Sequence, residues 1–157
     1  MFHLTLRTIG KLQETWQQEA VENYVKRLSP FARTTIQELA EQHGGSAKPD
    51  TAKTIKLEGE SLLKTLPSNA VILALDETGK ELDSVAFAQK IETLGGQGQP
   101  LVFIVGGSWG LDASVRARAD FVLSLGKMTL PHALARITLL EQLYRAMTIL
   151  KGKTYHK

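Results

Sequence analysis

Residues 124–157 read SLGKMTLPHALARITLLEQLYRAMTILKGKTYHK, and this stretch contains an irregular loop, a long helix and a basic tail. Thr129 is a suitable N-cap for the helix, and Pro131 falls in the first turn, where a missing N–H costs nothing. The helix should run to about Leu150 and be closed by Gly152. The stretch therefore predicts that one long helix is the last regular element of the fold.

The apolar residues of this helix cover a wide arc. They are Leu134, Ile137, Leu139, Leu140, Leu143, Tyr144, Met147 and Leu150. At about 100° per residue they span more than half of the helix surface, which is wider than the stripe of a helix with one buried side. We therefore expect the helix to bury two faces, one against a sheet and the other against a second subunit.

Two polar residues, His132 and Arg136, lie within this arc at i and i+4, near the positive end of the helix. They need polar partners there, and two interpretations are open. Carbonyl groups or a carboxylate at an interface could bind them, or a phosphate or carboxylate of a ligand could do so. Glu141 and Arg145 lie on the narrow polar side and are predicted to form an ordinary surface pair.

The composition is that of one ordinary folded domain, spanning residues 1–157, because 43% of the 157 residues are hydrophobic. Cysteine is absent, which excludes disulfides, thiolate metal sites and a cysteine nucleophile. The four histidines are too scattered for a zinc site, so we expect no metal. The N-terminus lacks a secretory pattern and no apolar run approaches about 18 residues, so a cytoplasmic location is expected.

Charge is distributed unevenly along the chain. Residues 121–157 hold six basic side chains and one acidic side chain, whereas residues 1–120 hold 13 basic and 15 acidic ones. This asymmetry is typical of a protein whose C-terminal part meets a polyanion such as nucleic acid, although a short basic tail can also serve only solubility.

The order of apolar and polar residues predicts alternating strands and helices. Strands are expected at 2–8, 33–39, 70–75, 101–105 and 121–124. Helices are expected at 11–28, from an N-cap at Asp50 to about Leu66, from an N-cap at Ser84 to Gly95, and from Asp112 over a short stretch, before the final helix. A loop is expected at 41–50 and a turn at 76–80. The alternation predicts an α/β fold with a mostly parallel five-stranded sheet and helices on both faces.

Ligands of open α/β sheets bind beyond the carboxyl ends of the strands. Three segments leave such ends here: Leu75-Asp76, residues 106–110 and residues 125–130. Glycines in the second segment would let a ligand approach the backbone closely. A Gly-Gly pair can also serve only a tight turn between strand and helix, so this signal is weak by itself.

Three familiar site motifs are missing from the sequence. Residues 106–110 read GGSWG rather than G-x-G-x-x-G and follow a late strand, which disfavours a dinucleotide site. No G-x-x-x-x-G-K-[ST] phosphate loop and no G-x-S-x-G nucleophile elbow occurs. Nicotinamide oxidoreductases, phosphate-loop nucleotidases and serine hydrolases of the elbow type are therefore disfavoured.

Several segments together resemble the RlmH family, small SPOUT-class methyltransferases that act on a pseudouridine of large-subunit ribosomal RNA. The motifs are Leu73-Ala74-Leu75-Asp76 with Gly79-Lys80, FIVGGS at 103–108 with Gly110-Leu111, Leu123-Ser124 with Met128-Thr129, Pro131-His132, Arg136, Glu141-Gln142, Tyr144-Arg145-Ala146 and Tyr155-His156-Lys157. These motifs occur in order between residues 73 and 157, which makes the set far more specific than any single motif, and the resemblance covers the full length of 157 residues. Gly126 stands where many relatives have serine, so the loop has no side chain at that position.

The resemblance implies a SPOUT-type α/β fold with a C-terminal trefoil knot, and a homodimer. It also implies that S-adenosylmethionine binds in the loops at the three strand ends, mainly through backbone groups. The matching positions are Leu75, Gly106, Leu125, Gly126, Lys127, Met128, Thr129 and Leu130.

The activity implied is methyl transfer from S-adenosylmethionine to N3 of a pseudouridine in large-subunit ribosomal RNA, within the assembled ribosome. Tyr155 would stack on the target base and His156 would act as general base, while Lys157, His132 and Arg136 are candidate substrate contacts. His132 and Arg136 could instead only hold the final helix in the dimer, and the tail by itself could be a disordered terminus. Two alternatives are a knotted methyltransferase acting on tRNA and a non-catalytic factor that binds RNA or the ribosome.

Overall fold

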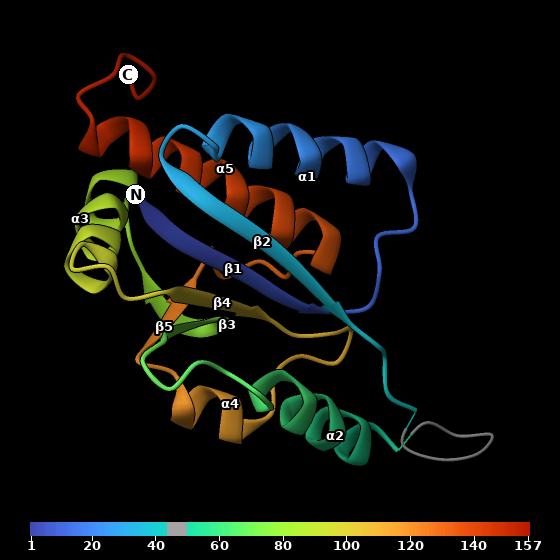
Figure 1. Ribbon diagram of the computed structural model, residues 1–157. Coiled ribbons are helices and arrows are strands. Elements are labelled where there is room, and N and C mark those ends of the chain that lie inside the picture. Colours follow the sequence, from blue (N-terminus) through green and yellow to red (C-terminus); the bar gives the residue numbers. More distant parts are fainter. Residues whose placement is uncertain (44–49) are drawn as a thin grey trace.

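The computed structural model describes residues 1–43 and 50–157, which form five strands and five helices in strict alternation (Figure 1). The strands are β1 (Phe2–Ile9), β2 (Ala32–Leu39), β3 (Val71–Glu81), β4 (Leu101–Val105) and β5 (Phe121–Ser124). The helices are α1 (Thr15–Leu28), α2 (Thr51–Leu63), α3 (Ser84–Gly95), α4 (Ala113–Arg118) and α5 (His132–Leu150). The central part of the loop expected at 41–50 lies outside the described residues.

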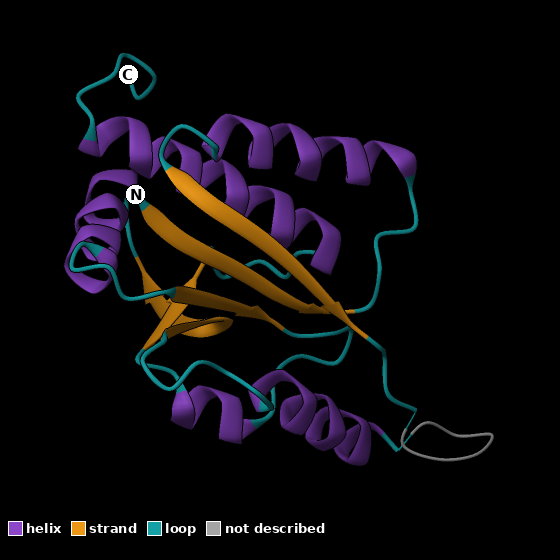
Figure 2. Cartoon of the chain, viewed as in Figure 1, coloured by secondary structure: helices purple, strands orange, loops and turns teal. Residues whose placement is uncertain are grey.

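All five strands are parallel and are ordered β2-β1-β4-β3-β5. Helices α1, α3 and α5 cover one face of the sheet, and α2 and α4 cover the other (Figures 1 and 2). The predicted α/β architecture, with a five-stranded sheet and helices on both faces, is therefore confirmed, and the sheet is parallel throughout.

The central strand β4 shows why the sheet has two cores. Its residues Leu101, Phe103 and Val105 join the core under α1, α3 and α5, whereas Val102 and Ile104 join the core under α2 and α4. Successive side chains of a strand point to opposite faces, so a continuously apolar strand supplies both cores at once. This pattern suits β4 to its place between β1 and β3, where all five of its side chains are buried.

The strand β3 is longer than the sequence predicted. The turn expected at 76–80 is wrong, because the strand runs to Glu81. Its pairing with β5 shifts between Leu75 and Lys80, so residues 76–79 form an irregular bulge and not a reversal of the chain. A Cβ on Gly79 would come within 2.7 Å of the carbonyl oxygen of Val122, so only glycine fits this close strand contact.

Two predicted helix starts, those of α1 and α3, are displaced. Helix α1 begins at Thr15 rather than Lys11, with a reciprocal capping box between Glu14 and Gln17. Asp83, not Ser84, caps α3 by accepting a hydrogen bond from the N–H of Ala86 at 2.7 Å. A carboxylate one residue earlier is the stronger acceptor for the positive end of a helix.

The start of α5 also differs from its prediction. Pro131 occupies the N-cap position rather than the first turn, and Thr129 lies outside the helix, so the predicted Thr129 cap is wrong. No side chain of the described residues caps α5. The predicted helix end is confirmed, because the helix stops at Leu150 and Gly152 takes a positive φ of 59°.

After β5, at the edge of the sheet, the chain returns so that α5 lies between α1 and α3 (Figure 1). The sheet and these two helices cover much of the wide apolar arc of α5, including Leu139, Leu140 and Leu143. A second subunit is therefore not needed to explain most of the arc. Among the described residues, no helix is both long and apolar enough to cross a membrane.

Candidate functional site

The carboxyl ends of β4 and β5 and the bulge of β3 meet at one open groove of about 1050 Å³. Residues 75–78 of β3 line it, together with the segments at the ends of β4 and β5, residues 105–111 and residues 125–133 with the exception of Lys127. The groove thus gathers the three segments that the sequence had indicated as strand ends. Its far wall includes Gln17 of α1.

Glycines shape the middle of the groove. Gly106 is buried, and a Cβ there would lie 2.8 Å from the carbonyl oxygen of Gly110, so the turn after β4 can close only around glycine. Gly110 takes a φ of 90°, a conformation that residues with a side chain rarely adopt. The turn therefore presents its backbone, with the exposed Trp109 side chain beside it, to the groove.

An ion pair lies at the rim of the groove. Nη1 of Arg116 donates to Oδ2 of Asp76 at 3.2 Å and to the carbonyl oxygen of Leu111 at 2.7 Å. Burial opposes ionisation of Asp76, but the hydrogen bonds from Thr78 and the charge of Arg116 outweigh it, so the pKa of Asp76 lies below its ordinary value. Asp76 is therefore an anion at neutral pH and ties the bulge of β3 to α4.

The loop between β5 and α5 forms the third wall. The N–H of Gly126 donates to Oγ of Ser124, which donates in turn to the carbonyl oxygen of Gly126, both at 3.1 Å. Gly126 has a φ of 133°, and a Cβ there would meet no atom of the described chain within 4 Å. The side chain of Met128 is 86% exposed. The loop therefore offers open backbone and an unburied apolar side chain.

Seven of the eight residues expected to bind the methyl donor line this groove: Leu75, Gly106, Leu125, Gly126, Met128, Thr129 and Leu130. The eighth, Lys127, belongs to the same loop, is exposed, and is not among the lining residues in the described part of the chain. The structure therefore brings together segments that are up to 55 residues apart in sequence.

His132 and Arg136 have different surroundings although they lie one turn apart. His132 lines the groove, where burial and the neighbouring guanidinium of Arg136 lower its pKa. Arg136 is 1% exposed and points away from the solvent into the fold. It binds the carbonyl oxygens of Ile9 and Gly10 and the carboxylate of Glu38. Arg136 therefore joins α5 to the ends of β1 and β2 within one chain.

The tail folds back on α5. The ring of Tyr155 lies edge-on to Tyr144 at 4.8 Å between centroids, under the guanidinium of Arg145 at 4.7 Å. Nδ1 of His156 lies 3.4 Å from Nη1 of Arg145. Lys157 is exposed. The tail is therefore attached to its own helix through an aromatic and cationic cluster.

His156 lines a second cavity of about 570 Å³. This cavity and the groove share Leu123, Leu125 and Gly126, so they lie on two sides of the loop after β5. Gln142 and Ser84 also line the second cavity and hydrogen-bond to each other at 3.0 Å. Within one chain, the general-base candidate therefore lies close to the loop of the groove but outside the groove itself.

Sequence reasoning missed two parts of this region. Glu141 and Arg145 were predicted to be an ordinary surface pair, but both are partly buried and hold the tail through Tyr155 and His156. Gln17 was assigned only to a helix, yet it lines the groove. Neither role leaves a local pattern in the sequence, because both depend on how distant elements pack.

No group of three or more histidine, cysteine or acidic side chains suited to a metal ion occurs among residues 1–43 and 50–157.

Comparison with known proteins supports one family over the whole chain. Residues 2–156 match the family model described as "Predicted SPOUT methyltransferase". Similar proteins named ribosomal RNA large subunit methyltransferase H include those of Carboxydothermus hydrogenoformans, 42% identical with 98% of this chain and 99% of the relative covered, and Gluconacetobacter diazotrophicus, 43% identical with 98% and 97% covered. The relative from Clostridium beijerinckii is 42% identical, with 99% of each chain covered. The chain therefore belongs to the SPOUT methyltransferases, in the family of ribosomal RNA large subunit methyltransferase H.

Proposed function

We propose that this protein transfers a methyl group from S-adenosylmethionine to N3 of a pseudouridine in large-subunit ribosomal RNA. The observation that carries the proposal is the convergence of the bulge of β3 and the ends of β4 and β5 on one groove lined by Leu75, Gly106 and the loop after β5. The names of the relatives, which specify a methyltransferase of large-subunit ribosomal RNA, support the class of substrate.

The residues of the groove suit such a methyl donor. The exposed side chains of Trp109, Met128 and Leu130 offer apolar surface for an adenine ring and an aliphatic chain. The open backbone at Gly126 allows close approach, and the carboxylates of Asp76 and Glu77 offer negative charge near a cationic ligand. The groove volume lies at the upper end of the range, about 300–1,000 Å³, typical of small-molecule sites.

S-adenosylmethionine, when bound, supplies an electrophilic methyl group on a sulfonium, so the protein need not form a covalent intermediate. In the proposed reaction the N3–H bond of the base breaks, an N3–methyl bond forms, and the sulfur–methyl bond breaks to leave S-adenosylhomocysteine. The chain must align N3 with the methyl carbon, which can contribute about 7–11 kcal/mol, and must accept one proton.

The tail supplies the group that accepts the proton and the groups that contact the RNA. We assign proton acceptance to the imidazole of His156 and stacking on the target base to Tyr155, with Lys157 neutralising RNA phosphate. Because His156 lies outside the groove of its own chain, the proposal includes a homodimer in which the tail of one protomer serves the groove of the other.

The proposal has three further features. They are a trefoil knot formed by the C-terminal segment, a cytoplasmic location, and an assembled ribosomal subunit as substrate. The concentration of basic side chains in residues 121–157 supports a polyanionic partner. A chain of 17.3 kDa has little surface for reading a long sequence, so recognition should depend on the shape of folded RNA.

Binding of the methyl donor can be tested with the protein's own fluorescence. The chain has two tryptophans, and Trp109 lines the groove whereas Trp16 does not. A Trp16→Phe variant should show a saturable fluorescence change on titration with S-adenosylmethionine. The matched Trp109→Phe variant should lose that change while calorimetry still reports binding. Absence of binding by both methods would exclude the proposed reaction.

The substrate can be tested by mass spectrometry of RNA. Ribosomal RNA and tRNA from cells with and without this protein should differ by N3-methylpseudouridine in large-subunit RNA only. A difference confined to tRNA would identify a tRNA methyltransferase, and no difference in either pool would support a non-catalytic binding factor. Incubation of the purified protein with labelled donor and either free RNA or ribosomal subunits then identifies the form of the substrate.

A further inference from the structure

We propose that Arg136 and Glu38 position the methyl-donor loop, although neither lines the groove. The identity of the ligand rests on the proposed function. The way in which Arg136 acts on the loop rests on the packing of α5. Arg136 is a positioning residue in this view: it acts through the loop of residues 125–131, which it holds at one end.

The two ends of this loop are held differently. Its first residues follow β5, and the reciprocal hydrogen bonds between Ser124 and Gly126 fix them. Its last residues enter α5 at Pro131, where no side chain of the described residues caps the helix. A helix start without a cap is prone to fraying, so another contact has to fix this end.

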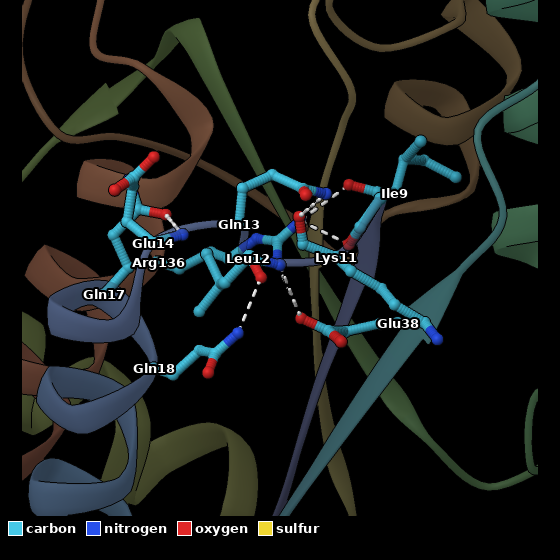
Figure 3. A network of polar contacts seen from close by, with 10 residues as sticks. Ile9, Lys11, Leu12, Gln13, Glu14, Gln17, Gln18, Glu38 and Arg136 are labelled. Carbon is cyan, nitrogen blue, oxygen red and sulfur yellow. Dashed lines mark hydrogen bonds and ion pairs between the residues drawn. The ribbon is translucent and has the colours of Figure 1, made fainter.

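Arg136, in the second turn of α5, provides that contact (Figure 3). Its Nη2 donates to the carbonyl oxygens of Ile9 at 2.6 Å and Gly10 at 2.9 Å, and its Nη1 donates to Oε1 of Glu38 at 3.1 Å. Charge-assisted hydrogen bonds from a planar guanidinium fix both distance and direction. The start of α5 is thereby tied to the ends of β1 and β2.

The backbone at Gly10 is shaped to receive the guanidinium. Gly10 has a φ of 78°, and its carbonyl oxygen and that of Ile9 both accept from Nη2. The positive φ favours glycine at this turn, whereas the atom that a Cβ would meet, Oε1 of Glu41 at 2.6 Å, ends a flexible side chain that can move aside. The acceptors are therefore built into the end of β1.

The same network extends to the opposite wall of the groove. Oε1 of Glu38 also accepts from the N–H of Leu12 at 3.3 Å, and Gln18 donates to the carbonyl oxygen of Leu12 at 2.9 Å (Figure 3). The neighbouring Gln17 accepts from the N–H of Glu14 and lines the groove. Arg136 and Glu38 thus connect the wall made by α1 to the loop before α5.

The test compares Arg136→Met with Leu143→Ala, a change at a buried residue farther along α5 whose side chain packs in the core. Both variants should lower the melting temperature. Only Arg136→Met should weaken binding of S-adenosylmethionine, by tenfold or more, and raise KM for the donor more than it lowers kcat. Arg136→Lys should recover part of the affinity, because one ammonium can still reach the carbonyl oxygens.

Hydrogen exchange separates failure of this inference from failure of the proposed function. Amides of residues 125–135 should exchange faster in Arg136→Met than in Leu143→Ala, whatever ligand the wild-type protein binds. If Arg136→Met does not fold, Glu38→Gln, which keeps an acceptor but removes the charge, should show the same exchange and a smaller loss of affinity. Equal exchange and wild-type donor affinity in the folded variants would overturn the inference.

Discussion

The phenol of Tyr155 donates a hydrogen bond to Oε1 of Glu141 at 3.2 Å, and the same oxygen accepts from Nε and Nη2 of Arg145 at 3.1 and 2.7 Å. One carboxylate oxygen thus joins the tail to the last turns of α5. Since Nη1 of Arg145 also lies 3.4 Å from His156, the cluster sets where the general-base candidate lies.

Changes in the tail should separate methyl transfer from donor binding. Removal of residues 155–157 should abolish methylation and leave the affinity for S-adenosylmethionine almost unchanged, because the tail is proposed to contact the target base and does not line the groove of its own chain. His156→Ala should lower kcat by about 100-fold or more, the usual contribution of a general base. The measurement is methyl transfer to ribosomal subunits together with calorimetric titration of the donor.

Two further variants serve as controls for the tail. Tyr155→Phe keeps the ring against Tyr144 and loses only the hydrogen bond to Glu141, so it should lose far less activity than Tyr155→Ala. Thr154→Ala alters an exposed residue of the same segment and should behave as wild type. Methylation at the normal rate by the truncated protein would remove the tail from the site.

The contact between β3 and β5 should be intolerant of any side chain at Gly79. A Cβ there would approach the backbone of Val122 and Leu123 to 2.7 Å, and backbone cannot move aside as a flexible side chain can. Gly79→Ala should cost about 3 kcal/mol of stability, a typical upper value for overpacking, which corresponds to roughly 6–12 °C in melting temperature. Lys80→Ala, at an exposed position of the same strand, is the control. Equal melting temperatures for the two variants would contradict the close contact.

Much of the fold could be predicted because its signals are local. The continuous apolar runs at 70–75 and 101–105 are typical of parallel strands buried on both faces, and both lie in the centre of the sheet. The extension of β3 through residues 76–81 could not be predicted, since its polar residues resemble a turn. It is held in the sheet by pairing with β5, more than 40 residues away.

The candidate site was predictable in outline for a similar reason. Parallel strands end at one edge of a sheet, so Leu75, Gly106 and Leu125 had to lie near one another once the strands were identified. The partners of Arg136 were not predictable, because Ile9, Gly10 and Glu38 lie about 100 residues or more before it. Spacing within α5 could only indicate that a buried guanidinium needs acceptors.

The turn after β4 should be required for donor binding. A methyl group at Gly106 would press on the carbonyl oxygen of Gly110 and displace the turn that lines the groove. Gly106→Ala should weaken binding of S-adenosylmethionine at least tenfold, which is about 1.4 kcal/mol. Gln97→Ala, an exposed change in the segment before β4 that does not line the groove, should keep wild-type affinity. Tight binding by a folded Gly106→Ala protein would show that the turn does not contribute.

His132 should make the stability of the fold depend on pH below neutrality. Burial, and secondarily the charge of Arg136, lower its pKa in the folded protein below the ordinary value of 6.5. As the pH falls through about 6.5, His132 therefore binds a proton more readily in the unfolded chain than in the folded protein. The stability that the neutral imidazole provides is lost as the pH decreases. Chemical denaturation of wild type and His132→Gln between neutral pH and about pH 5 should show a steeper decline for wild type. Glu58, whose pKa burial raises, acts in the opposite direction in both proteins and cancels in the comparison. Parallel stability curves for the two proteins would mean that the pKa of His132 is the same in the folded and unfolded states.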